Sequence, residues 1–272
     1  MENARTTVTP AMGRLRRRPA PIVCCVGSTD PTAAAGLFAD ARHLARLRVR
    51  PAFVVAGVTA QNSARVFRVD ALPARAILAQ LRAIWAQVRP DAVRIGLLPD
   101  AASIDAVARF FAGRRDRPPI VVDPVLAASS GRTFLDARAI AALRRLLRYA
   151  TIATPNRREA SILTGTRVAG VDGAERAALA LARDGIAALV TGGDASGARI
   201  VDVLAVRDRA IRLSAPRIGR GMRGTGCCMS AALAAALARG DDVERAVLFA
   251  RGYVRRIIAS ASPLGRGKAQ PA

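Results

Sequence analysis

Short apolar runs alternate with amphipathic, helix-like segments along most of this 272-residue chain. The apolar runs occupy residues 21–27, 52–58, 92–98, 119–125, 151–154 and 187–193. The helix-like segments occupy residues 32–47, 74–88, 103–113, 137–148 and 173–185. Such alternation predicts an α/β fold with a mostly parallel central sheet covered by helices on both faces.

The alternation breaks once, where residues 198–206 and 210–216 predict an antiparallel hairpin. No internal repeat or interdomain linker interrupts the pattern, so we expect one domain over residues 21–262. Residues 1–20 are predicted to be a basic flexible tail, and residues 263–272 a polar flexible end.

The formal net charge of +23 raises the question of nucleic-acid binding. The charges are spread along the chain, however, and the only local cluster is GRLRRRP at 13–19. Aromatic residues make up 4% of the chain and do not interleave with basic ones, as single-strand binders require. We therefore expect no specific nucleic-acid partner, and non-specific polyanion affinity as a by-product of the charge.

Cysteine usage and hydropathy indicate the compartment. The four cysteines form two vicinal pairs without zinc-ligand spacing, which fits a reducing cytoplasm. No run of about 18 apolar residues and no signal-peptide core is present, so no membrane association is expected.

Polar and glycine-rich loops follow the predicted strands. Because carboxyl ends of parallel strands meet at one edge of a sheet, we expect these loops to form one site. They are GSTDPTAAAG (27–36), TAQNS (59–63), DPVLAASSG (123–131), TPNRREA (154–160), TGGD (191–194) and RGTGC (223–227).

The last of these loops precedes the strongly helix-forming residues 229–238. Gly224 and Gly226 permit positive φ or close backbone approach, and the N–H groups at a helix start form an anion site. In isolation, a tight turn before a core helix is the alternative interpretation.

The motifs TAQN, RIGLL, VVDPVLAASSG, TPNRREASILTG and GTGC occur in this order. With them, residues 21–260 resemble the hydroxymethylpyrimidine and phosphomethylpyrimidine kinases of thiamine biosynthesis, within the ribokinase-like superfamily. The resemblance implies a single three-layer α/β/α sandwich that uses ATP and Mg²⁺. It also implies phosphorylation of an aminopyrimidine, 4-amino-5-hydroxymethyl-2-methylpyrimidine, and of its monophosphate to the diphosphate.

The resemblance assigns the catalytic base to Cys227 and the anion hole to Gly224, Thr225, Gly226 and Cys227. A helix N-terminus also lowers the pKa of a thiol, so we expect some thiolate at Cys227. Its neighbour Cys228 lies about 100° further around the helix and is expected to pack inside.

Two carboxylates are expected near the metal by the same resemblance, Glu159 and, less directly, Asp123. Glu159 lies on the first turn of a predicted helix with Asn156 as N-cap, so helix capping is the alternative role for it. The nucleotide-binding residues implied by the resemblance are Thr191, Gly193, Asn156 and Arg223.

For the acceptor pocket, the resemblance assigns Gln61, Asp40 and Leu97. A side-chain amide such as that of Gln61 offers both a donor and an acceptor to an aminopyrimidine edge. His43, three residues after Asp40, is expected at the exposed surface. The chain departs from the family pattern at Ala33-Ala34, where Gly-Gly is usual, at Phe38 and at Arg223, and Arg223 is expected to grip a phosphate.

Three alternatives remain open from sequence. A pyridoxal-type kinase is disfavoured because GTGC stands in place of GTGD. A catalytically weak pyrimidine-binding regulatory module is permitted by the altered first loop, and nucleic-acid binding is permitted by the charge. The oligomeric state is also open, with a homodimer among the states allowed.

Overall fold

The computed structural model describes residues 19–128, 131–183, 185–219, 222–263 and 269–270. The strands of its main sheet are β1 (Ile22–Thr29), β2 (Arg50–Gln61), β3 (Val66–Ala71), β4 (Ala92–Ile95), β5 (Ile120–Val122), β6 (Ile152–Ala153), β7 (Ala187–Val190), β8 (Arg199–Val206) and β9 (Arg209–Pro216). The helices are α1 (Gly36–Arg46), α2 (Ala74–Gln87), α3 (Ala101–Ala112), α4 (Ala137–Leu147), α5 (Arg157–Thr164), α6 (Gly170–Ala182), α7 (Thr225–Leu237) and α8 (Val243–Ala259).

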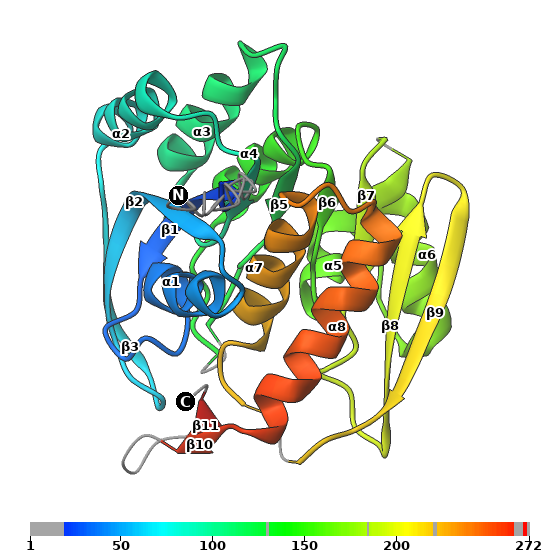
Figure 1. Ribbon diagram of the computed structural model, residues 1–272. Helices are drawn as coiled ribbons and strands as arrows, with labels where there is room; N and C mark the ends of the chain where they lie inside the picture. Colours follow the sequence, from blue (N-terminus) through cyan, green and yellow to red (C-terminus); the bar gives the residue numbers. More distant parts are fainter. Residues whose placement is uncertain (1–18, 129–130, 184, 220–221, 264–268, 271–272) are drawn as a thin grey trace, which may run out of the picture.

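The strand order in the described sheet is β3-β2-β1-β4-β5-β6-β7-β8-β9 (Figure 1). From β2 to β7 every neighbouring pair in this order is parallel. The edges are antiparallel, with β3 against β2 and the β8–β9 hairpin against β7. The mostly parallel sheet and the hairpin expected from the sequence are therefore confirmed.

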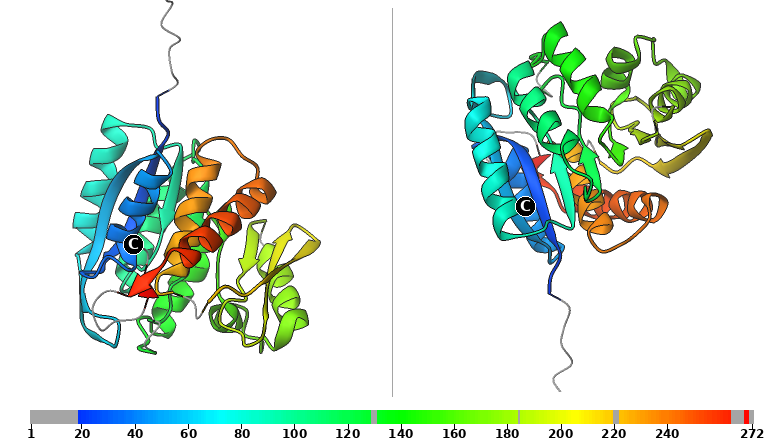
Figure 2. Two further views of the ribbon diagram at one scale, coloured as in Figure 1. Left: turned by 60° about the horizontal axis from the view of Figure 1, so that its bottom comes forward. Right: turned by 90° about the horizontal axis from the view of Figure 1, so that it is seen from above.

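Helices cover both faces of the sheet, and alternate strand residues supply the two cores. α1, α7 and α8 lie together on the face toward the viewer in Figure 1, and their core includes Val23 and Cys25 of β1. Helices α2, α3 and α4 cover the other face (Figure 2), and their core includes Cys24 and Val26 of β1. A strand that is buried on both faces cannot alternate apolar with polar residues, which explains the continuous run at 21–27.

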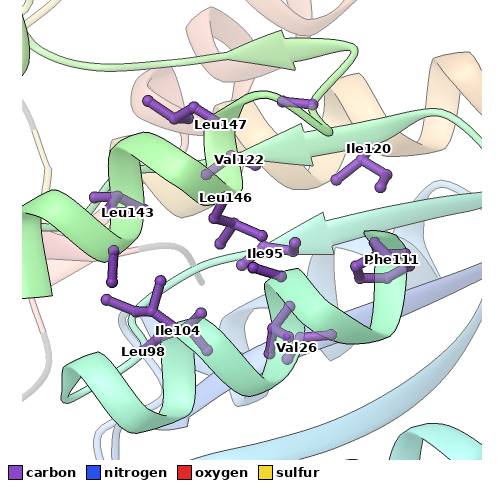
Figure 3. Close-up of a cluster of buried hydrophobic side chains, with 14 of the residues drawn as sticks. Val26, Ile95, Leu98, Ile104, Phe111, Ile120, Val122, Leu143, Leu146 and Leu147 are labelled. Carbon is purple, nitrogen blue, oxygen red and sulfur yellow. The ribbon is translucent and has the colours of Figure 1, made fainter. Parts of the chain in front are cut away.

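The core beneath α3 and α4 is made of branched aliphatic residues and Phe111 (Figure 3). Ile104 and Phe111 on α3 and Leu143 and Leu146 on α4 are buried against the sheet. Removing any of these side chains leaves a cavity between tightly packed layers.

Several boundaries differ from the sequence prediction. Strand β3 is not predicted from the sequence, because Arg68 and Asp70 interrupt its apolar residues. The structure identifies this strand by its antiparallel pairing with β2. β5 ends at Val122, since Pro124 has no N–H to donate to a parallel neighbour.

The predicted tails are only partly described. Residues 1–18 of the expected tail at 1–20 lie outside the described residues. Of the expected tail at 263–272 the structure describes residues 263 and 269–270, where β11 (Ala269–Gln270) pairs with β10 (Ser262–Pro263), and the flexible end stays a prediction.

Candidate active site

One cavity of about 570 Å³ lies where the carboxyl ends of the parallel strands face the start of α7. All of the site residues predicted from the sequence line it, except Asp40. They are Cys227, Gly224, Thr225, Gly226, Gln61, Leu97, Thr191, Gly193, Asn156, Arg223, Glu159 and Asp123.

Gly224 makes the turn into α7. Its φ of +80° is in the left-handed region, and a Cβ there would lie 1.8 Å from the carbonyl oxygen of Ala34. The loop after β1 therefore packs directly on this turn, as glycine alone permits. No side chain caps α7, so its first N–H groups remain available for an anion in the cavity.

Cys227 lies on the first turn of α7 and lines the cavity. Its pKa is raised to about 12, mainly by burial, with Asp123 and Asp40 adding to the shift and Arg94 opposing it. The expected lowering of this pKa is therefore wrong for the ligand-free site, because desolvation and two nearby carboxylates outweigh the charge of Arg94. Cys228 is fully buried, as expected.

Glu159 caps a helix and also lines the cavity. Asn156 and Glu159 form a reciprocal capping box at the start of α5, with both hydrogen bonds at 2.9 Å. The second carboxylate oxygen accepts from the Leu126 N–H at 3.4 Å, and the residue lines the cavity. Burial, with Asp123 adding to it, raises the pKa of Glu159 to about 8.

Asp123 is fixed by a buried arginine that the sequence analysis did not single out. The Nη2 of Arg94 donates to Asp123 at 2.8 Å, and its Nη1 lies 3.1 Å from the carboxylate of Asp40. Nε of Arg94 donates to Ser230 of α7 at 3.0 Å. Arg94 thus joins β4, β5, α1 and α7 directly beneath the anion-binding turn.

A signal for Arg94 was present in the sequence. An arginine inside the buried strand AVRIG is exceptional unless it is paired, and a glycine follows two residues later. A Cβ on Gly96 would lie 1.9 Å from Nη1 of Arg94, so this glycine makes room for the guanidinium. Burial raises the pKa of Asp123 and raises that of Asp40 to about 6, although Arg94 opposes both shifts.

Asp40 and His43 correct two expectations. Both lie on the inner face of α1 and are fully buried, so Asp40 does not reach the cavity wall and His43 is not at the surface. Nδ1 of His43 lies 3.0 Å from the Tyr253 hydroxyl. Burial, with the arginines of α1 adding to it, lowers the pKa of His43 to about 4, so the ring is neutral near pH 7.

Arg223 lines the cavity, but its charge is already engaged. Its Nη2 lies 3.3 Å from Asp30, and Nη1 donates to Thr32 at 3.2 Å. Asp30 also accepts from the N–H groups of Thr32 and Ala35. The ion pair therefore organises the loop after β1 and competes with the phosphate contact expected for Arg223.

Asp123 and Glu159 suit a magnesium ion. Magnesium prefers oxygen ligands and commonly takes one or two carboxylates together with waters and substrate phosphates. In the described residues, no group of three or more His, Cys, Asp or Glu side chains surrounds a common metal position.

The described helices include none that is both long and apolar enough to cross a membrane.

Comparison with known proteins identifies the family of this chain. The family model described as phosphomethylpyrimidine kinase matches residues 30–272. The chain belongs to the phosphomethylpyrimidine kinase family. It is 38% identical to a hydroxymethylpyrimidine/phosphomethylpyrimidine kinase of Rhizobium meliloti over 252 residues, covering 91% of this chain and 94% of that relative.

Two solved structures share the fold. A phosphomethylpyrimidine kinase from Clostridium difficile has a TM-score of 0.76 at 28% identity, covering 87% of this chain and 98% of that one. An ADP complex of Bacillus subtilis pyridoxal kinase has a TM-score of 0.86 at 28% identity, with coverages of 93% and 97%. The predicted ribokinase-like α/β/α fold and the prediction of a kinase are confirmed.

Proposed function

We propose that this protein transfers the γ-phosphoryl group of ATP to 4-amino-5-hydroxymethyl-2-methylpyrimidine and then to its monophosphate. The observation that carries the proposal is that the uncapped start of α7 lines the same cavity as Gln61 and Leu97 and as Asn156 and Thr191. It thus offers room for an acceptor and a nucleotide around one anion-binding turn.

The transferred phosphoryl group carries charge that must be stabilised while it moves. The N–H groups of Gly224, Thr225, Gly226 and Cys227 supply that stabilisation from a fixed position. They are preorganised, since the turn is locked against the loop after β1 at Ala34.

The acceptor is oriented by Gln61, whose amide can pair with the ring nitrogen and exocyclic amine of an aminopyrimidine. Cys227 then receives the proton of the acceptor hydroxyl. Since its thiol is protonated in the ligand-free site near pH 7, Cys227 must first lose its own proton to water. The positive charge of bound Mg²⁺ would favour that loss, whereas the charge of the nucleotide would oppose it.

Asp123 and Glu159 would hold Mg²⁺, Glu159 through water because its oxygens serve the capping box and the Leu126 N–H. Magnesium, when bound, neutralises phosphate charge. Arg94 keeps Asp123 oriented toward the cavity from below.

Measuring ADP release by the purified protein with three acceptors tests the proposal. We expect turnover with hydroxymethylpyrimidine and with its monophosphate, and little with pyridoxal. The structural likeness to a pyridoxal kinase makes pyridoxal the informative competitor. Turnover with pyridoxal alone would assign the chain to the alternative acceptor, and binding without turnover would indicate a regulatory module.

We also propose a cytoplasmic homodimer. All four cysteines are free, which fits a reducing compartment.

The proposed dimer rests on large exposed apolar side chains. They lie on β2 and β3, at one edge of the sheet, and on α1: Phe53, Val58, Phe67 and Phe38. Light scattering should give twice the chain mass, and Phe67→Glu should shift it toward the monomer; a wild-type monomer would exclude the dimer.

A further inference from the structure

The loop after β7, residues 191–194, is held from beneath by a buried carboxylate. The N–H of Gly192 donates to Oδ1 of Asp202 on β8 at 2.8 Å. A Cβ on Gly192 would lie 2.1 Å from the carbonyl oxygen of Val201, so the loop backbone lies directly on β8. Asp202 itself is 6% exposed and does not line the cavity.

The other oxygen of Asp202 is held by α8. Nε of Arg251 donates to it at 2.8 Å, and Nη2 of Arg251 donates to the carbonyl oxygen of Leu213 on β9 at 2.6 Å. Arg251 therefore fixes the direction of the carboxylate, which in turn fixes the N–H of Gly192.

Further contacts tie the same loop at its two ends. The N–H of Thr191 donates to the carbonyl oxygen of Pro155 at 2.9 Å, next to Asn156. Arg217 donates to the carbonyl oxygen of Gly193 at 3.2 Å. Thr191 and Gly193 line the cavity, and Gly192 between them carries the contact to Asp202.

We propose that Asp202 and Arg251 are positioning residues for the nucleotide-binding loop, acting through the N–H of Gly192. The proposal rests on the proposed function, which assigns Thr191 and Gly193 to the nucleotide. Neither residue of the pair touches the cavity, so their effect is on nucleotide affinity and leaves the acceptor pocket near Gln61 unchanged.

The test measures ADP binding by calorimetry without acceptor, and the KM values for ATP and for hydroxymethylpyrimidine. Arg251→Met removes the ion pair and leaves the loop sequence intact. We expect the Kd for ADP and the KM for ATP to rise about tenfold, equivalent to ~1.4 kcal/mol, with little change in kcat or in the acceptor KM. Arg251→Lys should restore part of the affinity.

Glu244→Gln is the matched control. Glu244 also lies on α8 and pairs with Arg209 of β9, but this ion pair is exposed and does not reach the loop. The ADP affinity of the Glu244→Gln variant should equal that of the wild type. A similar loss in Glu244→Gln and Arg251→Met would overturn the proposal, because it would show a general effect of loosening α8.

Asp202→Asn serves if Arg251→Met does not fold. The asparagine side chain keeps one oxygen, which can accept from the N–H of Gly192, but it has no second oxygen for Arg251. We therefore expect a smaller loss of ADP affinity. Unchanged ADP affinity in a folded variant, or an equal rise in the acceptor KM, would overturn the positioning role. Failure of the wild type to phosphorylate any acceptor would overturn the proposed function separately, since ADP binding is measured without turnover.

Discussion

At the scale of single residues, Cys227 has the environment that differs most from expectation. A helix N-terminus alone would favour the thiolate, but burial and the carboxylates of Asp123 and Asp40 raise the thiol pKa. Removing its proton is therefore costly unless ligands change the local field. The two proposed phosphorylations differ in their need for this step.

Cys227→Ala should reduce phosphorylation of the alcohol much more than that of the monophosphate. The alcohol must lose a proton, whereas a phosphate monoester with a second pKa near 6 is largely ionised at neutral pH. We expect a loss of about 10²-fold or more for the alcohol, in steady-state assays of both acceptors. Cys228→Ala, in the adjacent buried position, should stay nearly active. Equal losses for both acceptors would show that Cys227 shapes the anion hole instead of accepting a proton.

Glu159→Gln tests the metal role. Glutamine keeps the shape and an oxygen for the Asn156 N–H but cannot become charged when Mg²⁺ binds, so turnover should fall and the magnesium concentration for half-maximal activity should rise. Activity is to be titrated against Mg²⁺ at fixed ATP. A variant with the wild-type magnesium dependence would leave Glu159 with the helix-capping role alone.

The same variant has a predicted pH signature in stability. The pKa of Glu159 is raised from 4.5 to about 8 in the folded protein. Between these values the folded state binds more protons than the unfolded state, so the contribution of this group to the free energy of unfolding falls as pH rises. In metal-free buffer the Tm of the wild type should decline relative to that of Glu159→Gln between pH 5 and pH 8. Parallel Tm curves for the two proteins would contradict the raised pKa.

At the scale of elements, the approach of the loop after β1 to the start of α7 is the tightest constraint in the described site. Gly224→Ala places a methyl group where the carbonyl oxygen of Ala34 lies, at a φ of +80°. We expect a loss of stability of about 1–3 kcal/mol from strain alone, measured by urea unfolding, together with a loss of activity. Gly193→Ala is the control for stability, because nothing lies within 4 Å of its Cβ position. Wild-type stability in Gly224→Ala would contradict the close packing of the two loops.

Helix α1 shows how an element decides the position of its residues. Asp40, His43 and Leu44 recur at three- and four-residue spacing and share its inner face, so docking of α1 on the sheet buries all three. Arg94 from β4 meets Asp40 there, and Tyr253 from α8 meets His43. No property of α1 alone predicts these partners.

At the scale of the whole molecule, the site is assembled from loops distributed between residues 28 and 227. A ligand that contacts several of these loops holds the sheet and α7 together, so it should stabilise the entire fold. At a concentration of 100 times its Kd, MgATP should add about 2.7 kcal/mol. This corresponds to a rise in Tm of about 5–10 °C for a protein of this size.

Thermal melting with ATP and Mg²⁺, and with ATP and EDTA, measures this effect. The rise in Tm should be largely lost with EDTA if Asp123 and Glu159 act through the metal. An equal rise in both buffers would contradict the assignment of these carboxylates to magnesium.

The layered α/β architecture and the location of the site could be predicted from the amino-acid sequence. Apolar runs such as 21–27 and 119–125 have the length and bulk of strands buried on both faces, and parallel strands bring their following loops to one edge. That geometry is why Gln61, Asp123, Asn156 and Thr191, far apart in the chain, were predicted to meet and do line one cavity. The capping box of Asn156 and Glu159 was also predictable, because its two residues are only three positions apart in the sequence.

The contacts of each side chain in the site depend on how the helices and strands pack against one another. Burial and the charge of a neighbour act through space, so the raised pKa of Cys227, the inward position of Asp40 and the engagement of Arg223 by Asp30 depend on docked elements. The edge strand β3, whose apolar residues are interrupted by Arg68 and Asp70, is likewise defined by its hydrogen bonds to β2. Asp202 and Arg251, 49 residues apart, meet only because α8 packs on the hairpin side of the sheet.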